Sequence, residues 1–230
     1  MGMTTILAIL ALVTQPQAIT REHLKVEGWS VEINTALLKN DREGIETTMK
    51  LLVGQLKTIK RLVPKPAVAK LQRVTLWFSP EYPGVRPTAE YHPGAQWLRE
   101  NGRDPIMAKG VEFTNVRTFE AEIKRMPVLV LHELAHSYHD QVLGFDNLEI
   151  EAAYQKAKAG GKYDLVKRWI GTKFADKTER AYAMTNAQEY FAEGTEAYFA
   201  KNDFFPFDRK ELEETDPGLC KLMKEVWSKS

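Results

Sequence analysis

The residues best suited to chemistry lie in one short stretch, residues 128–140, which reads VLVLHELAHSYHD. It carries His132, Glu133 and His136 in the order H-E-x-x-H. Two histidines four residues apart lie about one turn apart on the same face of a helix, so both imidazoles can bind one metal ion. Glu133 lies roughly 100° around the helix, where its carboxylate can take a proton from a metal-bound water. The stretch therefore predicts half of a zinc site together with its general base.

His139 is the nearest candidate for a third ligand. Along a helix it lies about 10.5 Å from His132, which is too far for both to bind one ion. The three-histidine pattern H-E-x-x-H-x-x-G-x-x-H is also excluded, because His139 and Val142 occupy the positions of its glycine and last histidine. We predict instead that His139, with Asp140 assisting, supports the ligands by hydrogen bonding, and that the third ligand comes from elsewhere.

A second predicted helix, residues 186–201 (NAQEYFAEGTEAYFAK), offers that ligand. Glu189, Glu193 and Glu196 follow one another at i, i+4 and i+7 among aromatic residues. Like charges at these spacings repel each other, so such a stripe calls for a counter-charge, which a zinc ion and its histidines would supply. A solvated acidic face remains the alternative, and spacing alone does not rank the three carboxylates.

The wider pattern resembles a known family. HELAH at 132–136, followed by Tyr182-x6-Glu189 and then Glu193, is similar to the zinc-binding pattern of the peptidases typified by the anthrax lethal factor catalytic domain. The resemblance covers about residues 128–200. It implies His132, His136 and Glu189 as zinc ligands, Glu133 as general base, Tyr182 near the substrate oxyanion and Glu193 as the carboxylate that orients a histidine.

A broader similarity runs from VEGW near Val26 to the final helix. It is to uncharacterised exported bacterial proteins described as metallopeptidases. It covers nearly the whole chain after the N-terminal segment but implies no substrate. Outside the zinc helices the chain departs from lethal factor, so the specificity of that protein is not implied.

Several elements must position these residues. The alternation over residues 24–34 predicts a strand with a bulge at Gly28 and Trp29, and the apolar spacing over 41–63 predicts an amphipathic helix. VTLWF at 74–78 predicts a buried strand. The prolines and glycines of 80–94 predict a long irregular loop, either substrate-facing or simply packed on the surface.

Residues 111–116 predict a short strand just before the metal helix. As an edge strand beside the ion it would pair with an extended substrate, although a covered hairpin arm fits equally well. Beyond the metal helix, residues 147–170 predict helix divided by Gly160 and Gly161, and further helices follow Asp208 and Asp216. The fold class predicted is α+β and zincin-like, with a small mixed sheet, an active-site helix and a helical C-terminal lobe.

The amino-acid composition limits the classes of binding partner and metal ligand that the sequence predicts. The 230 residues include 32 Lys and Arg against 31 Asp and Glu, so no overall field favours nucleic acid or an acidic membrane surface. The one cysteine, Cys220, cannot form an internal disulfide or a thiolate pair, so metal ligands must be histidine or carboxylate.

The N-terminus predicts export. The apolar run TTILAILALV at 4–13 is too short to span a bilayer but suits a signal peptide over residues 1–18. Residues 19–230 are long enough for one domain, with an N-terminal lobe over about 19–141 and a C-terminal lobe over about 142–230.

These patterns lead to one functional hypothesis and two alternatives. The hypothesis is hydrolysis of a peptide or protein substrate with one Zn²⁺ ion and Glu133 as general base. The first alternative is a catalytically inactive exported zinc-binding or interaction domain, for which a retained base has no use. The second is a metal hydrolase whose substrate is not a peptide.

Overall fold

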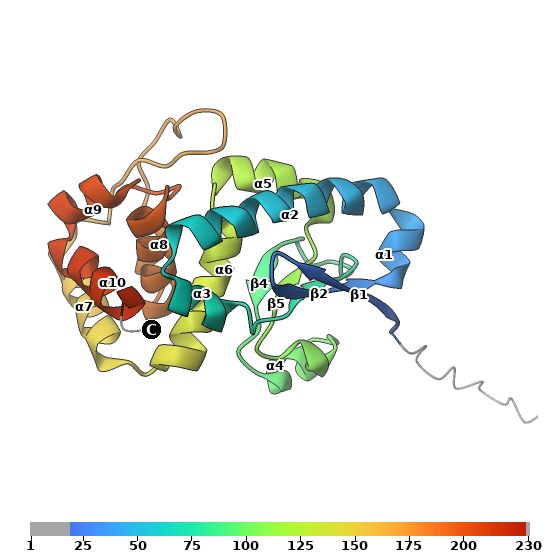
Figure 1. Ribbon diagram of the computed structural model, residues 1–230. Helices are drawn as coiled ribbons and strands as arrows, with labels where there is room; N and C mark the ends of the chain where they lie inside the picture. The colour runs from blue at the N-terminus through green and yellow to red at the C-terminus, as the bar shows by residue number, and fades with distance from the viewer. Residues whose placement is uncertain (1–18, 229–230) are drawn as a thin grey trace, which may run out of the picture.

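The computed structural model describes residues 19–228, so the predicted signal peptide lies outside the described residues (Figure 1). The chain has the predicted mixed α+β architecture. Its sheet has the order β1-β2-β3-β5-β4, in which β2, β3 and β5 run parallel to one another and β1 and β4 are antiparallel edge strands. The strands are β1 (Arg21–Val26), β2 (Trp29–Asn34), β3 (Leu76–Phe78), β4 (Ala89–Tyr91) and β5 (Val111–Phe113).

The first two strands correct one prediction. Residues 24–34 are not a single bulged strand but parts of a hairpin, in which Val26 pairs with Trp29 across a two-residue turn. Glu27 and Gly28 have φ angles of 52° and 104°, a conformation that favours glycine. A Cβ on Gly28 would also lie 2.1 Å from the Gln72 amide nitrogen. The change of phase at Gly28 therefore marks a turn.

Helices cover both faces of the sheet (Figure 1). One face packs against α2 (Arg42–Leu62), α3 (Lys65–Leu71), α5 (Phe119–Arg125) and α6 (Leu129–Tyr138), and α1 (Thr35–Asn40) joins β2 to α2. The predicted helix over 41–63 is present, capped by Asp41, whose Oδ1 accepts from Gly44 N at 3.3 Å. On the other face lie α4 (Ala95–Glu100) and a 3-10 turn (Pro105–Met107).

The C-terminal lobe consists of α7 (Leu148–Gly160), α8 (Ala187–Phe199), α9 (Arg209–Thr215) and α10 (Pro217–Ser228). The helix predicted over 147–170 divides at Gly160 and Gly161 as expected, because Gly161 is left-handed with φ of 66° and terminates α7, but the predicted second piece is not helical. Turns and isolated bridges follow, such as Val166 with Glu179. One hydrophobic core runs through both lobes, from Trp29 to Trp227.

The position of the edge strand is a second correction. β5 lies between β3 and β4, so of the two alternatives for this segment the covered strand is found and the edge strand is not. The edge is β4, inside the stretch predicted as an irregular loop. A strand of three residues between Pro87 and Pro93 carries too little alternation to be recognised from sequence. No helix within residues 19–228 is both long enough and apolar enough to cross a membrane.

Candidate metal centre

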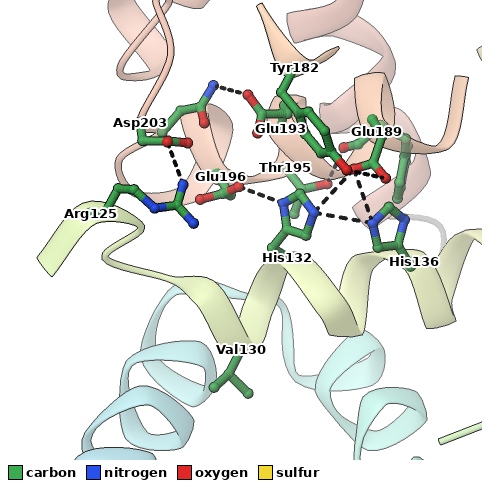
Figure 2. Close-up of polar contacts among 12 residues, drawn as sticks. Arg125, Val130, His132, His136, Tyr182, Glu189, Glu193, Thr195, Glu196 and Asp203 are labelled. Atoms are coloured by element: carbon green, nitrogen blue, oxygen red, sulfur yellow. Dashed lines mark hydrogen bonds and ion pairs between the residues drawn. The ribbon is translucent and has the colours of Figure 1, made fainter. Parts of the chain in front are cut away.

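Two packed helices, α6 and α8, bring three potential metal ligands together (Figure 2). His132 and His136 project from α6, and their Nε2 atoms lie 3.2 Å apart. Glu189, in the first turn of α8, places its Oε2 3.3 Å from each of these nitrogens. The three atoms form a nearly equilateral triangle on one side of the cleft.

The triangle has the dimensions of a zinc site. Ligands about 2.0 to 2.1 Å from a tetrahedral ion lie about 3.3 Å from one another. Glu189 Oε2 is buried and has no hydrogen-bond partner among the described residues, so its lone pairs are left for another ligand. Two imidazoles and one carboxylate with an open fourth direction form the donor set of a catalytic zinc site. The residues present therefore fit this ion.

Other helices pack against both long sides of α6, and this packing holds the two histidines in place. Val130 points toward α2, whereas His132 and His136 point toward α8 (Figure 2). Every residue of α6 except His136 is buried. A helix enclosed on all sides shows no amphipathic stripe in its sequence, so only the H-E-x-x-H spacing reveals which face carries the site.

Glu196 fixes the orientation of His132. The Nδ1 of His132 lies 2.7 Å from Glu196 Oε1 and donates to this carboxylate, which leaves the Nε2 lone pair for a metal. The sequence-based prediction gives this role to Glu193, whose carboxylate accepts instead from Asn202 Nδ2 at 3.0 Å. Positions seven apart are offset by only about 20° on a helix, so Glu189 and Glu196 both face α6.

A second group of buried ligand atoms consists of His132, Glu193 and Glu196. It is a poorer candidate for a metal. The 2.7 Å between His132 Nδ1 and Glu196 Oε1 is a hydrogen-bond distance and is shorter than the roughly 3.3 Å that separates two ligands of one tetrahedral zinc ion. The Glu189 side of His132 is therefore the better candidate for a metal.

Charge interactions within the site shift several pKa values. Burial lowers the pKa of His132, but the nearby carboxylates of Glu189 and Glu196 outweigh burial and hold that pKa well above its ordinary value. Burial raises the pKa of Glu189, yet the two histidines reverse this and lower it overall. Burial raises the pKa of Glu196 to about 7, against the opposing hydrogen bond from His132. A proton on His132 thus competes with a metal for Nε2.

Glu133 lines the cleft beside the triangle, held by the edge strand. Its Oε2 accepts a hydrogen bond of 2.9 Å from the backbone N–H of Tyr91 in β4. Burial raises the pKa of Glu133, and the positive charges of the two histidines partly offset this. The carboxylate thus has a fixed position and an increased affinity for a proton, as a general base requires.

Tyr182 lies above the histidine pair (Figure 2). It begins a 3-10 turn (Tyr182–Met184) just before α8, and it is 47% exposed to the cleft. Its hydroxyl donates to Glu189 Oε1 at 3.4 Å. Burial, followed by the charge of Glu189, raises the pKa of Tyr182 to about 12, so the phenol remains a proton donor at neutral pH.

Neither His139 nor Asp140 forms a hydrogen bond to His132, His136 or Glu189 in the part of the chain that the structure describes. His139 is fully buried between the rings of Phe145 and Phe191, and neither ring nitrogen has a partner among the described residues. Asp140 accepts from Tyr91 Oη and Lys109 Nζ, both at 2.6 Å, and contacts no histidine. Asp140 thus ties the end of the metal helix to β4 and not to the ligands.

The site opens into a cleft of about 840 Å³ between the two lobes. Its lining includes β4, the metal-helix residues His132, Glu133 and His136, and the segment around Ile170. Comparison with known proteins finds no matching family, curated protein or solved structure. The resemblance to the lethal factor type of peptidase therefore remains a prediction from the motif.

Two groups that orient site residues were not predicted from the sequence. They are the carboxylate of Glu196, which orients His132, and the backbone N–H of Tyr91, which holds Glu133. The spacing of seven between Glu189 and Glu196 was a usable signal, since it places both on one face of a helix. No sequence pattern reports a backbone N–H, so the contact from Tyr91 to Glu133 needed the structure.

Proposed function

We propose that the chain is a zinc-dependent peptidase. The observation that carries the proposal is the triangle of ligand atoms from His132, His136 and Glu189 beside a buried glutamate in an open cleft. A structural zinc site is closed by four protein ligands, whereas this arrangement offers three and leaves one side toward the cleft. When bound, zinc would polarise a substrate carbonyl and lower the pKa of a coordinated water.

Glu133 is the proposed general base. Its Oε2 accepts from Tyr91 N–H, which leaves Oε1 available to receive a proton from the attacking water and return it to the leaving amine. Because burial raises the pKa of Glu133, the carboxyl can hold that proton between the two steps. Tyr182 is proposed to donate a hydrogen bond to the oxyanion that forms during the reaction. Its hydroxyl is protonated and lies beside Glu189, one corner of the ligand triangle.

β4 is the proposed substrate strand, in place of the strand predicted from sequence. Its inner edge pairs with β5, as the hydrogen bonds from Thr114 N to Thr88 O and from His92 N to Gly110 O indicate. Backbone groups of an antiparallel strand alternate in direction, so those of Ala89 and Tyr91 point away from β5. An extended peptide could pair with this edge and lay its scissile carbonyl beside the metal.

The test combines zinc analysis with cleavage of a peptide library by the parent and by Glu133→Gln. Both proteins should bind one zinc ion, and only the parent should cleave. Glu120→Gln, an exposed change on α5, serves as control and should behave as the parent does. Zinc in all three proteins with no cleavage by any of them would contradict a peptidase and favour an inactive zinc-binding domain or another hydrolase.

A further inference from the structure

A second cluster of charged residues lies on the face of the sheet away from the metal helix. We call it the Glu112 cluster, and it consists of Tyr82, Glu90, His92, Arg103 and Glu112. Glu112, in β5, is 0% exposed. Removing a carboxylate from water costs several kcal/mol, about as much as its partners can return, so net stability gives little reason for this arrangement.

Partners surround the buried carboxylate. Tyr82 Oη donates to Glu112 Oε1 at 2.8 Å, and His92 Nε2 and Arg103 contact Oε2 at 2.9 and 3.0 Å. Burial raises the pKa of Glu112, but the hydrogen bonds from His92 and Tyr82 outweigh it and lower the pKa overall. The carboxylate is thus held ionised.

Arg103 joins β4, which lines the cleft, to β5. Its guanidinium lies between the rings of Tyr82 and Trp97, with each centroid 4.8 Å away. From there the same nitrogen donates to Glu112 of β5 at 3.0 Å and to Glu90 of β4 at 2.5 Å. Glu90 and Glu112 stand directly opposite each other in the ladder. Two facing carboxylates repel, so this pairing is favourable only with the arginine between them.

The cluster therefore opposes a change of register. β4 and β5 have three residues each, too few for backbone pairing alone to specify one alignment. A slip of one residue would turn Tyr91 to the opposite side of β4. Its N–H would then leave Glu133 and its hydroxyl would leave Asp140.

We propose that the Glu112 cluster locks the register of β4 and so positions both the general base and the substrate-pairing edge. Arg103 and Glu112 touch neither the ligand triangle nor Glu133, and they act through the Tyr91 amide. The part of this proposal that concerns catalysis rests on the proposed peptidase function, whereas the register lock does not.

The experiment measures backbone hydrogen exchange in Arg103→Met and Glu90→Met, with Arg21→Met as matched control. Arg21 is also a stacked arginine paired with a carboxylate, over Trp77 and 2.7 Å from Asp104, but it lies on β1 at the far edge of the sheet. Glu90→Met removes the β4 acceptor that Arg103 binds and keeps the Glu112 pairings, so it remains informative if Arg103→Met fails to fold.

The Tyr91 amide should exchange at least about tenfold faster in both cluster variants, with α8 amides and zinc stoichiometry unchanged. Arg103→Lys should restore part of the protection. Unchanged exchange at Tyr91, or an equal increase throughout the protein, would overturn the proposal. For a cleaved peptide, kcat should fall along with the protection at Tyr91. A parent that cleaves nothing would contradict only the peptidase function, because the exchange measurement needs no substrate.

Discussion

The metal centre and the Glu112 cluster lie on opposite sides of β4 and differ in one respect. Both bury carboxylates beside histidine. In the Glu112 cluster both oxygens of Glu112 accept hydrogen bonds from the protein. In the metal centre, Oε2 of Glu189 and Oε2 of Glu196 have no partner among the described residues.

The difference separates a structural network from a ligand site. A buried polar atom without a partner costs free energy, so a native structure retains it where a ligand completes it. An unpaired atom is not sufficient, however, as His139 illustrates with two unpaired nitrogens among aromatic rings. What distinguishes the metal centre is that Glu189 Oε2 converges with two further ligand atoms at the spacing of a zinc ion.

The largest expected effect comes from removing the unpaired carboxylate of the metal centre. Glu189→Ala should weaken zinc binding by more than about a hundredfold, beyond the 10- to 100-fold typical for a residue that only supports a ligand. Competition with a chromophoric chelator measures this affinity. Glu112→Gln changes a carboxylate that is more deeply buried than Glu189, and it should leave zinc affinity within about threefold, since it lies outside the ligand set. Equal losses of zinc affinity in the two variants would show that the unpaired carboxylate of Glu189 matters no more for zinc binding than the fully paired carboxylate of Glu112.

The next effect concerns Tyr182, which contacts Glu189 but is not a proposed ligand. Tyr182→Phe removes only the hydroxyl, so zinc should remain bound. Loss of one donor to a developing oxyanion lowers kcat by about 10²- to 10³-fold. Steady-state kinetics on a cleaved peptide, with zinc content measured in parallel, checks this. A variant with full kcat would show that the hydroxyl of Tyr182 does not assist the reaction.

Structural features that depend on a repeating pattern of apolar residues were predicted from the sequence, whereas features that depend on single contacts were not. The α+β class and the helix over 41–63 followed from repeating apolar patterns. The hairpin at Gly28 and the edge strand β4 depend on one or two residues with special backbone geometry or on a strand too short to alternate. Within the site, motif spacing indicated His132, Glu133 and His136, but choosing between Glu193 and Glu196 required knowing how α8 lies on α6.

His139 represents a third kind of buried polar group, which has no hydrogen-bond partner among the described residues and no neighbouring ligand atoms. Its effect on stability can be tested by changing the pH. Burial lowers its pKa from 6.5 to about 4. Its unfolded state therefore takes up a proton first as the pH falls. Its contribution to stability is complete above pH 6.5 and declines through the interval down to pH 4, by about 3 kcal/mol.

Comparison of denaturant unfolding for the parent and His139→Leu at pH 7 and pH 4 isolates this contribution, because the other titrating groups are common to both. The variant should gain about 3 kcal/mol relative to the parent on acidification. A difference between the two proteins that does not change with pH would mean that His139 finds a partner for its proton inside the fold.

The smallest expected effect separates two carboxylates one turn apart on α8. Glu196 accepts from His132 Nδ1, so Glu196→Gln should weaken zinc binding about 10-fold, at the lower end of the range for supporting residues because an amide oxygen can still accept. The pKa of Glu193 is well above its ordinary value, owing to burial and then to the charges of Glu196 and Asp203, and this shift favours the neutral acid. Glutamine resembles that acid in shape and charge, and Glu193→Gln should change zinc affinity by less than about threefold.

Titration of both variants at pH 8, where Glu196 is ionised, gives the sharpest contrast. A larger loss in Glu193→Gln would restore the assignment made from sequence and would mean that His132 changes its hydrogen-bond partner when the metal binds.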